Sequence, residues 1–195
     1  MSRATQRSDF YTGTGDRGDT GRLRGKVRVS KNSALMEAVG TVDEAMSAIG
    51  LARTQCCIER LKDALPTIQR HLYRLLSHLS AVPEARDQYP GLTPGDVTWL
   101  EELIAEIEGP LPPLKEFVLP GDSLSGAAFH VARAIVRRAE RRLVAFAELE
   151  PDLGRPNLIY LNRLSSLLFV AALSEDLRVG RKLGTEDPDL RPPTP

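Results

Sequence analysis

The amino-acid sequence predicts an all-α protein, an up-and-down bundle of five helices with a glycine-rich loop near its N-terminus. Three observations support this prediction. Apolar residues recur at helical spacing through most of the chain, residues that start or end helices stand at the boundaries of these segments, and no long segment alternates polar and apolar residues. The 195 residues are 42% hydrophobic and 27% charged, a globular balance that allows a core without disulfides or metals.

The first two helices are predicted from apolar residues three and four positions apart, which share one face of an α-helix. In the first helix these residues are Leu35, Val39, Val42, Met46 and Ile49. In the second helix they are Leu61, Leu65, Ile68, Leu72, Leu75 and Leu79. Each series predicts an amphipathic helix whose apolar face packs into the bundle.

The other three helices are predicted from capping residues as well as from periodicity. Thr93 is a suitable N-cap and Pro94 a suitable first-turn residue, so a third helix should start there and end before the Gly-Pro pair at 109–110. The fourth helix should cover residues 123–149 and the fifth residues 156–179. The middle of the fifth helix is apolar on almost every side, which predicts that it is the buried central helix.

The chain is expected to form one domain, residues 10–180. The polar residues 1–9 and the proline-rich residues 181–195 are expected to be flexible tails. Short β-structure is expected only near residues 10–11 and 27–29.

Composition excludes several classes of function. Lys and Arg total 26 and Asp and Glu total 26, so the formal net charge is zero, which argues against a chain-wide grip on nucleic acid. The longest run without a charged residue has 11 residues, fewer than the roughly 18 of a membrane span. Residues 1–10 lack an apolar segment, so a secretory signal is not expected, and the adjacent Cys56 and Cys57 are expected to be reduced thiols in a cytoplasmic protein. His71 and His78 share a helix face, but without a third ligand a surface or core role is favoured over metal binding.

Residues 11–31 contain five glycines, six basic residues and two acidic residues, a local charge of +4. Glycines let backbone N–H groups turn toward an anion, threonines add donors, and bases neutralise the charge, which is the chemistry of a polyphosphate cradle. The segment is neither a Walker A loop nor a Rossmann turn. Composition alone leaves two alternatives open, a phosphate-binding loop and a flexible basic arm.

The predicted fourth helix carries a second unusual segment, residues 129–142. One face of it holds four charged residues, Arg133, Arg137, Glu140 and Arg141, whereas Arg138 and Arg142 are expected to point to solvent. Stacked arginines repel one another and need carboxylates or phosphates opposite. The neighbouring helices are expected to bury this face, which favours a buried ion-pair network or an anion site over an ion-paired surface.

A third segment lies in the predicted first helix. Gly40 is unfavourable in mid-helix by roughly 1 kcal/mol relative to alanine, which suggests a close backbone approach. Asp43 and Glu44 are the expected local partners of the arginine face, and two solvated acids are an equal alternative.

These segments, with two further ones, resemble the PduO-type ATP:cob(I)alamin adenosyltransferases. The similarity covers roughly residues 10–175, and the motifs occur in the family's order and spacing. The matching segments are residues 11–20, 28–31, 37–44, 117–121, 130–141 and 161–165.

The resemblance implies a homotrimeric five-helix bundle with active sites between subunits. It implies transfer of the 5′-deoxyadenosyl group of ATP to the cobalt of cob(I)alamin or a related corrinoid, with triphosphate as the leaving group. A corrinoid reductase and an adenosylcobalamin-dependent acceptor enzyme are implied as possible partners, and neither nucleic acid nor a membrane is expected.

The same resemblance implies roles for individual residues. Arg133 is expected to pair with Asp43 across the subunit interface, and Phe117 to pack against the lower face of the corrin ring. Mg²⁺ is expected near the ATP, held mainly through the phosphates. The expected ATP-binding residues are Thr12, Gly13, Thr14, Gly15, Asp16, Arg17, Gly18, Thr20, Lys31, Arg137, Glu140 and Asn162.

The sequence also departs from the family's usual residues, which leaves a non-catalytic sensor or delivery protein that binds ATP or adenosylcobalamin as an alternative. A nucleic-acid-binding bundle that uses the basic arm is a second alternative, which the zero net charge disfavours. The departures are at Arg17, Val39, Ala45, Met46, Asp122, Ser166, Leu173 and Ser174.

Overall fold

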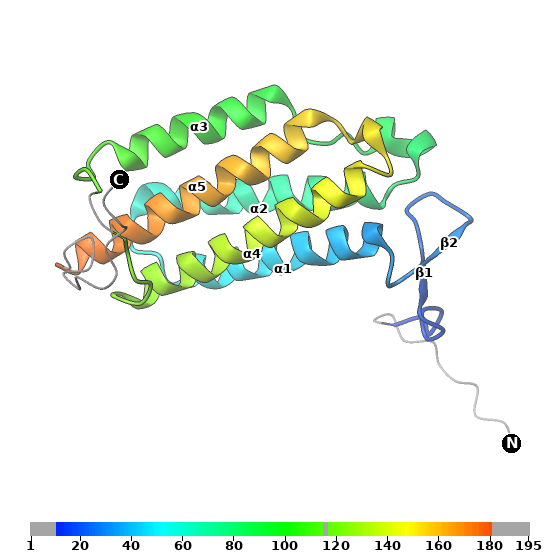
Figure 1. Cartoon of the computed structure of the whole chain (residues 1–195), viewed down its shortest axis with the longest axis horizontal. Helices are drawn as coiled ribbons and strands as arrows, with labels where there is room; N and C mark the ends of the chain where they lie inside the picture. Colours follow the sequence, from blue (N-terminus) through cyan, green and yellow to red (C-terminus); the bar gives the residue numbers. More distant parts are fainter. Residues whose placement is uncertain (1–10, 115–116, 181–195) are drawn as a thin grey trace, which may run out of the picture.

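A computed structural model of the chain describes residues 11–114 and 117–180. Its five long helices run alternately up and down the same axis, which can be followed by the colours in Figure 1. The predicted five-helix bundle is therefore confirmed, whereas the predicted tails at residues 1–9 and 181–195 lie outside the described residues. The helices are α1 (Ala34–Gln55), α2 (Glu59–Ser80), α3 (Pro94–Glu108), α4 (Leu124–Ala147) and α5 (Arg155–Arg178), with short 3₁₀ segments η1 (Pro83–Gln88) and η2 (Pro151–Leu153).

Side-chain caps explain where three of the helices begin. Ser33, Thr93 and Ser123 precede α1, α3 and α4, and each side-chain oxygen accepts a hydrogen bond from the backbone N–H three residues later. The carboxylate of Asp96 bonds back to the N–H of Thr93, which completes a capping box. The predicted starts at Thr93 and near Ser123 are confirmed, and α4 ends at Ala147, slightly before the predicted residue 149.

Helix α5 is deeply buried in the bundle, as predicted, whereas the helix that packs on both α1 and α5 is α4. Helix α5 packs against α3 and α4, and Leu161, Leu164 and Leu168 on it are fully buried. By length and composition α5 could span a membrane, with a mean hydropathy of 1.3 over its most apolar window, but 61% of that window is buried inside the bundle. The apolar surface of α5 therefore belongs to the core of the bundle.

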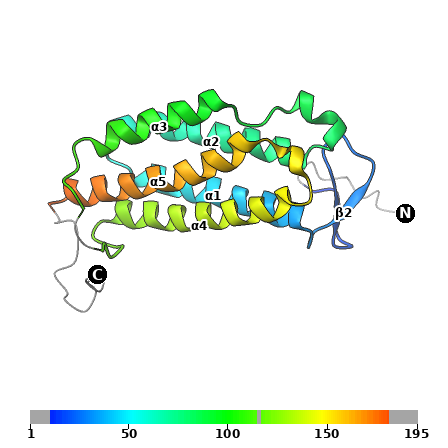
Figure 2. The same ribbon diagram turned by 45° about the horizontal axis from the view of Figure 1, so that its top comes forward.

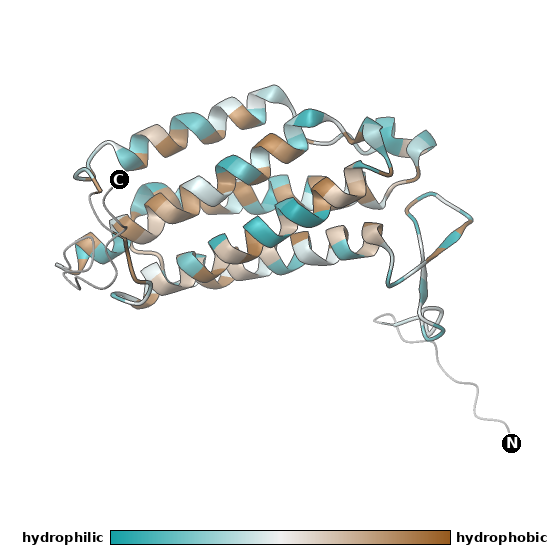
Figure 3. Ribbon diagram, viewed as in Figure 1, coloured by the Kyte–Doolittle hydropathy of each residue, from teal (hydrophilic) through white to brown (hydrophobic). Residues whose placement is uncertain are grey.

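The outer helices carry both hydrophobic and hydrophilic residues, and Figure 3 shows hydrophilic turns in the middle of α4.

A two-stranded antiparallel sheet precedes the bundle. Its strands are β1 (Asp19–Gly21) and β2 (Arg28–Ser30), with Thr20 opposite Val29. The expected β-structure near residues 27–29 is confirmed in part, whereas β1 was not predicted and Tyr11 forms no strand. Strand β1 escapes prediction because its sequence, Asp-Thr-Gly, has little strand propensity of its own. Figures 1 and 2 both place this hairpin beyond the end of the bundle, next to the start of α1.

Candidate active site

The glycine-rich segment folds into a hairpin in which hydrogen bonds between charged side chains and the backbone join its parts. The Arg28 guanidinium donates to both carboxylate oxygens of Asp19, at 2.8 and 2.9 Å, and to the carbonyl oxygen of Thr14 at 2.7 Å. This hydrogen bonding with Arg28 lowers the pKa of Asp19 below its usual range. In the sequence, Arg28 counts only among the six basic residues of this segment, because its partner Asp19 is identified only by the strand pairing.

Two glycines stand at tight positions of the hairpin, one with a left-handed backbone and one beside a lysine side chain. Gly18 has a φ of 80°, in the left-handed region that favours glycine. The Nζ of Lys31 donates to the carbonyl oxygen of Gly15 at 2.8 Å, and a Cβ on Gly15 would lie only 2.9 Å from that Nζ. Lys31 thus reaches directly across the loop that carries the predicted ATP-binding residues from Thr12 to Thr20, most of which are exposed.

A second group of predicted residues meets on the faces of α4 and α5. A cavity of about 340 Å³ is lined by Arg137, Glu140, Arg141, Val144 and Asn162. The side-chain amide of Asn162 donates to Glu140 at 2.9 Å. The structure therefore brings together Arg137, Glu140 and Asn162, although Asn162 lies on a different helix from the other two.

The outward face of α4 differs from the prediction, because Arg137 and Arg141 are exposed in the single chain rather than buried by neighbouring helices. Arg138 is exposed, as predicted, and forms a surface ion pair with Glu44 of α1. The Nε of Arg142 likewise lies 3.5 Å from a carboxylate oxygen of Glu37 on α1. These pairs form because α4 packs along α1, so Glu44 neutralises Arg138 and not the predicted arginine face.

Arg133 is half-buried and lacks a carboxylate partner among residues 11–114 and 117–180. Its guanidinium carbon lies 5.7 Å from the centre of the Phe169 ring, a cation–π contact. Its Nε is buried without a hydrogen-bond partner in the part of the chain that the structure describes. Asp43, its predicted partner, is exposed on α1 and forms no ion pair with another described residue. One chain therefore does not bring Arg133 and Asp43 into an ion pair.

The expected close backbone approach at Gly40 is wrong for the single chain. Gly40 is exposed, and among the described residues no atom lies within 4 Å of the place where its Cβ would be. The reason is that this side of α1 faces away from the rest of the bundle. The α1 helix therefore tolerates this glycine without using the space around it.

The histidines His71 and His130 differ in their polar contacts. His71 lies 3.0 Å from the hydroxyl of Tyr160 and 3.3 Å from a carboxylate oxygen of Asp96. His130 is buried beside Phe169, with ring centres 5.9 Å apart, but among the described residues neither of its ring nitrogens has a hydrogen-bond partner. Burial lowers the pKa of both histidines, and the charge of Arg133 lowers that of His130 further.

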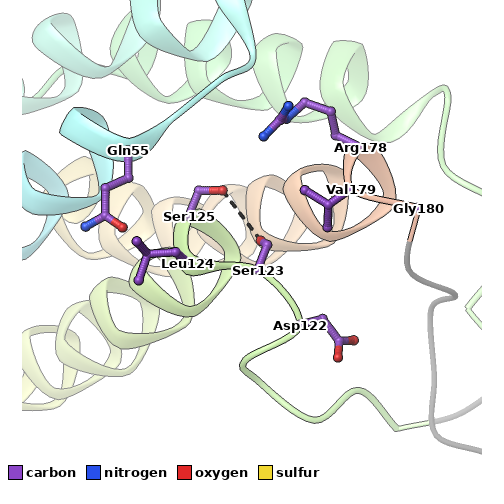
Figure 4. A pocket seen from close by; sticks show the side chains of 8 residues that line it. All are labelled: Gln55, Asp122, Ser123, Leu124, Ser125, Arg178, Val179 and Gly180. Carbon is purple, nitrogen blue, oxygen red and sulfur yellow. Dashed lines mark hydrogen bonds between the residues drawn. The ribbon is translucent and has the colours of Figure 1, made fainter.

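Phe117 lies in the connection between α3 and α4, and it is 60% exposed. At this end of the bundle a cavity of about 600 Å³ lies between the last turns of α1 and α5 and the first turn of α4 (Figure 4). Ser123 and Ser125 stand close together there, with their hydroxyl oxygens 3.5 Å apart. The lining residues are Gln55, Asp122, Ser123, Leu124, Ser125, Arg178, Val179 and Gly180.

The buried thiol at this end is not poised for reaction. Burial raises the pKa of Cys56 to about 12, and Cys57 is exposed. The backbone N–H of Cys57 donates to the buried carboxylate of Glu175 at 2.6 Å, so this corner has a structural role.

The predicted ATP-binding residues thus form two groups in one chain. One group lies on the hairpin beyond the bundle, and the other lines the cavity between α4 and α5. Within the described residues, no hydrogen bond or ion pair joins the two groups. The two groups are therefore separate in the single chain.

Comparison with known proteins gives one consistent result. The family model described as cobalamin adenosyltransferase matches residues 10–175. The corrinoid adenosyltransferase of Bacillus subtilis is 41% identical over 175 residues, 88% of each chain. The human corrinoid adenosyltransferase MMAB is 35% identical over 89% of this chain and 71% of its own length.

Solved structures give the same relationship. A variant of the PduO-type ATP:corrinoid adenosyltransferase from Lactobacillus reuteri, complexed with cobalamin and ATP, superposes with a TM-score of 0.81 and 31% identity, covering 90% of this chain and 98% of that one. An arginine-to-lysine variant of the same enzyme, complexed with ATP, superposes with a TM-score of 0.79 and 29% identity, covering 91% and 99%. The helical bundle and the matched sequence together show that this chain belongs to the cobalamin adenosyltransferase family of enzymes.

Proposed function

We propose that this enzyme transfers the 5′-deoxyadenosyl group of ATP to the cobalt of cob(I)alamin or a related corrinoid and releases triphosphate. The observation that carries the proposal is the cavity in which Arg137, Glu140 and Asn162 meet, in a chain whose relatives are corrinoid adenosyltransferases. In this reaction the reduced cobalt is the nucleophile, so the protein needs no nucleophilic side chain. Its task is to position the 5′ carbon and to stabilise the departing triphosphate.

Each group of residues has a defined role in this proposal. Arg137 faces the triphosphate from α4, and the hydrogen bond between Asn162 and Glu140 holds the wall of the cavity in place. Lys31 and the backbone N–H groups of the hairpin supply further positive charge and donors. Phe117, exposed at the other end of α4, packs against the lower face of the corrin ring.

We further propose that the active site lies between subunits of a homotrimer. The hairpin of one chain would cover the α4–α5 cavity of the next chain, and Arg133 of one chain would pair with Asp43 of its neighbour. The unpaired state of Arg133 and the projection of the hairpin away from its own bundle support this arrangement. Light scattering should give three times the chain mass of 21.4 kDa.

Mg²⁺ would act by neutralising phosphate charge. No group of three His, Cys, Asp or Glu side chains suited to a metal ion occurs among the described residues. The ion would be held mainly by the phosphate oxygens of ATP, as Mg²⁺ commonly is. We also propose a cytoplasmic location and functional coupling to a corrinoid reductase and to an acceptor enzyme that uses adenosylcobalamin.

The decisive experiment follows the cob(I) absorbance band after ATP and Mg²⁺ are added to chemically reduced cobalamin. We expect loss of the band, formation of a light-sensitive adenosylated product and stoichiometric release of triphosphate. Binding of ATP without turnover would instead support a sensor or delivery protein of the same fold. Release of pyrophosphate and phosphate without adenosylation would contradict the proposed reaction.

A further inference from the structure

The segment that joins the two hairpin strands lies against the corner between α2 and η1. The backbone N–H of Leu23 donates to the carbonyl oxygen of Ser80 at 2.8 Å. The N–H of Val82 donates back to the carbonyl oxygen of Leu23 at 3.1 Å, which makes a short parallel bridge. The hairpin is thus attached to the bundle at a point remote in sequence from its connection to α1.

Charged side chains reinforce this attachment. The Arg22 guanidinium donates to both carboxylate oxygens of Glu150, at 2.7 and 3.3 Å, and to the carbonyl oxygen of Ala81 at 2.6 Å. Arg86 of η1 forms an ion pair with the same carboxylate. The side chain of Arg22 is only 11% exposed and that of Arg86 only 9%. Glu150, which follows α4, therefore joins the hairpin to the end of α4 and to η1 through partly buried charges.

Packing at the neighbouring positions is equally close. A Cβ on Gly25 would lie 2.5 Å from a methyl carbon of Val82, so only glycine allows the backbone to approach this far. Arg24 donates to the hydroxyl of Tyr89 at 3.0 Å. The contacts from Arg22 to Gly25 thus form a continuous anchor rather than a single surface ion pair.

We propose that Arg22, held by the carboxylate of Glu150 and the carbonyl oxygen of Ala81, is a positioning residue that fixes the glycine-rich hairpin in the geometry that binds ATP. This inference rests on the proposed function. A two-stranded hairpin is marginally stable alone, so an unanchored loop would lose conformational entropy each time ATP bound. With the anchor, the hairpin is already ordered in the folded protein before ATP binds. The anchor should therefore lower the KM for ATP, although Arg22 does not contact the nucleotide.

The test compares Arg22→Met with the control Glu148→Gln, an exposed acid two residues before Glu150. We expect Arg22→Met to raise the KM for ATP about tenfold, because hydrogen bonds between charged groups are lost from the anchor. The KM for the corrinoid and the secondary structure should stay unchanged. Hydrogen exchange of the backbone amides in residues 18–31 should accelerate in Arg22→Met and not in the control.

A second variant covers the case in which Arg22→Met does not fold. Arg22→Lys keeps the charge beside Glu150 but loses the two-pronged hydrogen bonding, so a smaller rise in the KM for ATP is expected. An unchanged KM for ATP in whichever variant folds would overturn the inference.

Lys31→Ala distinguishes this failure from failure of the proposed function, because Lys31 belongs to the loop itself. If Lys31→Ala raises the KM for ATP and the Arg22 variants do not, the anchor is wrong and the loop still binds ATP. If Lys31→Ala leaves the KM unchanged, the hairpin does not bind ATP and the positioning role falls with it.

Discussion

The two groups of proposed ATP-binding residues are held in place by different forces. Asn162 and Glu140 stand on α5 and α4, whose other faces are packed into the apolar core. The hairpin has little apolar burial of its own, and its form depends on Arg28, Lys31 and the anchor around Arg22. The comparison teaches that one half of the site depends on the stability of the whole bundle, whereas the other half depends on a few polar contacts.

The largest effect should come from the core. Leu164→Ala removes a fully buried side chain from α5 and should lower the free energy of unfolding by about 3 kcal/mol. Urea unfolding measures this loss, with Leu149→Ala, at a position 69% exposed, as the control. A similar small loss in both variants would mean that α5 does not support the cavity through core packing.

A change on the cavity wall should affect catalysis and not stability. Arg137→Ala should lower kcat/KM about a hundredfold, because a positive charge facing the triphosphate is lost. Its melting temperature should stay near that of the parent protein, because Arg137 is exposed. Arg142→Ala, on the α1 side of the same helix, is the matched control. Equal activity of Arg137→Ala and the parent protein would remove Arg137 from the site.

The hairpin should respond more weakly and only toward ATP. Arg28→Ala removes the links to Asp19 and Thr14 and should raise the KM for ATP about tenfold, the scale of lost charged hydrogen bonds. Stability of the bundle should hardly change, since this pair is well exposed. The exposed Lys26→Ala provides the control within the same hairpin. If steady-state kinetics show the same KM in both variants, Arg28 does not shape the loop for ATP.

The smallest effect should be a pH dependence that belongs to the bundle. The pKa values of His71 and His130 lie below the usual 6.5 in the folded state, so the unfolded chain binds more protons as the pH falls below 6.5. Their contribution to stability is complete above that value and is lost as the pH falls through the folded-state pKa values. Urea titrations between about pH 7.5 and about pH 5.5 should show declining stability.

The variant His130→Leu should flatten this dependence, because it removes one of the two groups. A steeper slope would show that His130 is protonated in the folded protein. The pH profile of the KM for ATP should not follow the stability profile, because neither histidine is part of the hairpin.

Much of the fold could be predicted because its signals are local. The starts of α3 and α4 depend on Thr93 and Ser123 and on backbone groups three residues away. The burial of α5 follows from its continuous apolar surface. The site was harder to predict. The meeting of Asn162 with Glu140 could be expected only through the family resemblance, and neither β1 nor the role of Arg28 was anticipated.

The sequence by itself determined the helices, their order, the charged face of α4 and the glycine-rich segment, because periodicity, caps and turns act over a few residues. Only the tertiary structure decided which charges pair. Arg138 meets Glu44 because α4 packs on α1, and Arg22 meets Glu150 across 128 positions of sequence. Such pairs depend on the packing of whole elements, and a charged side chain carries no local signal that specifies its distant partner.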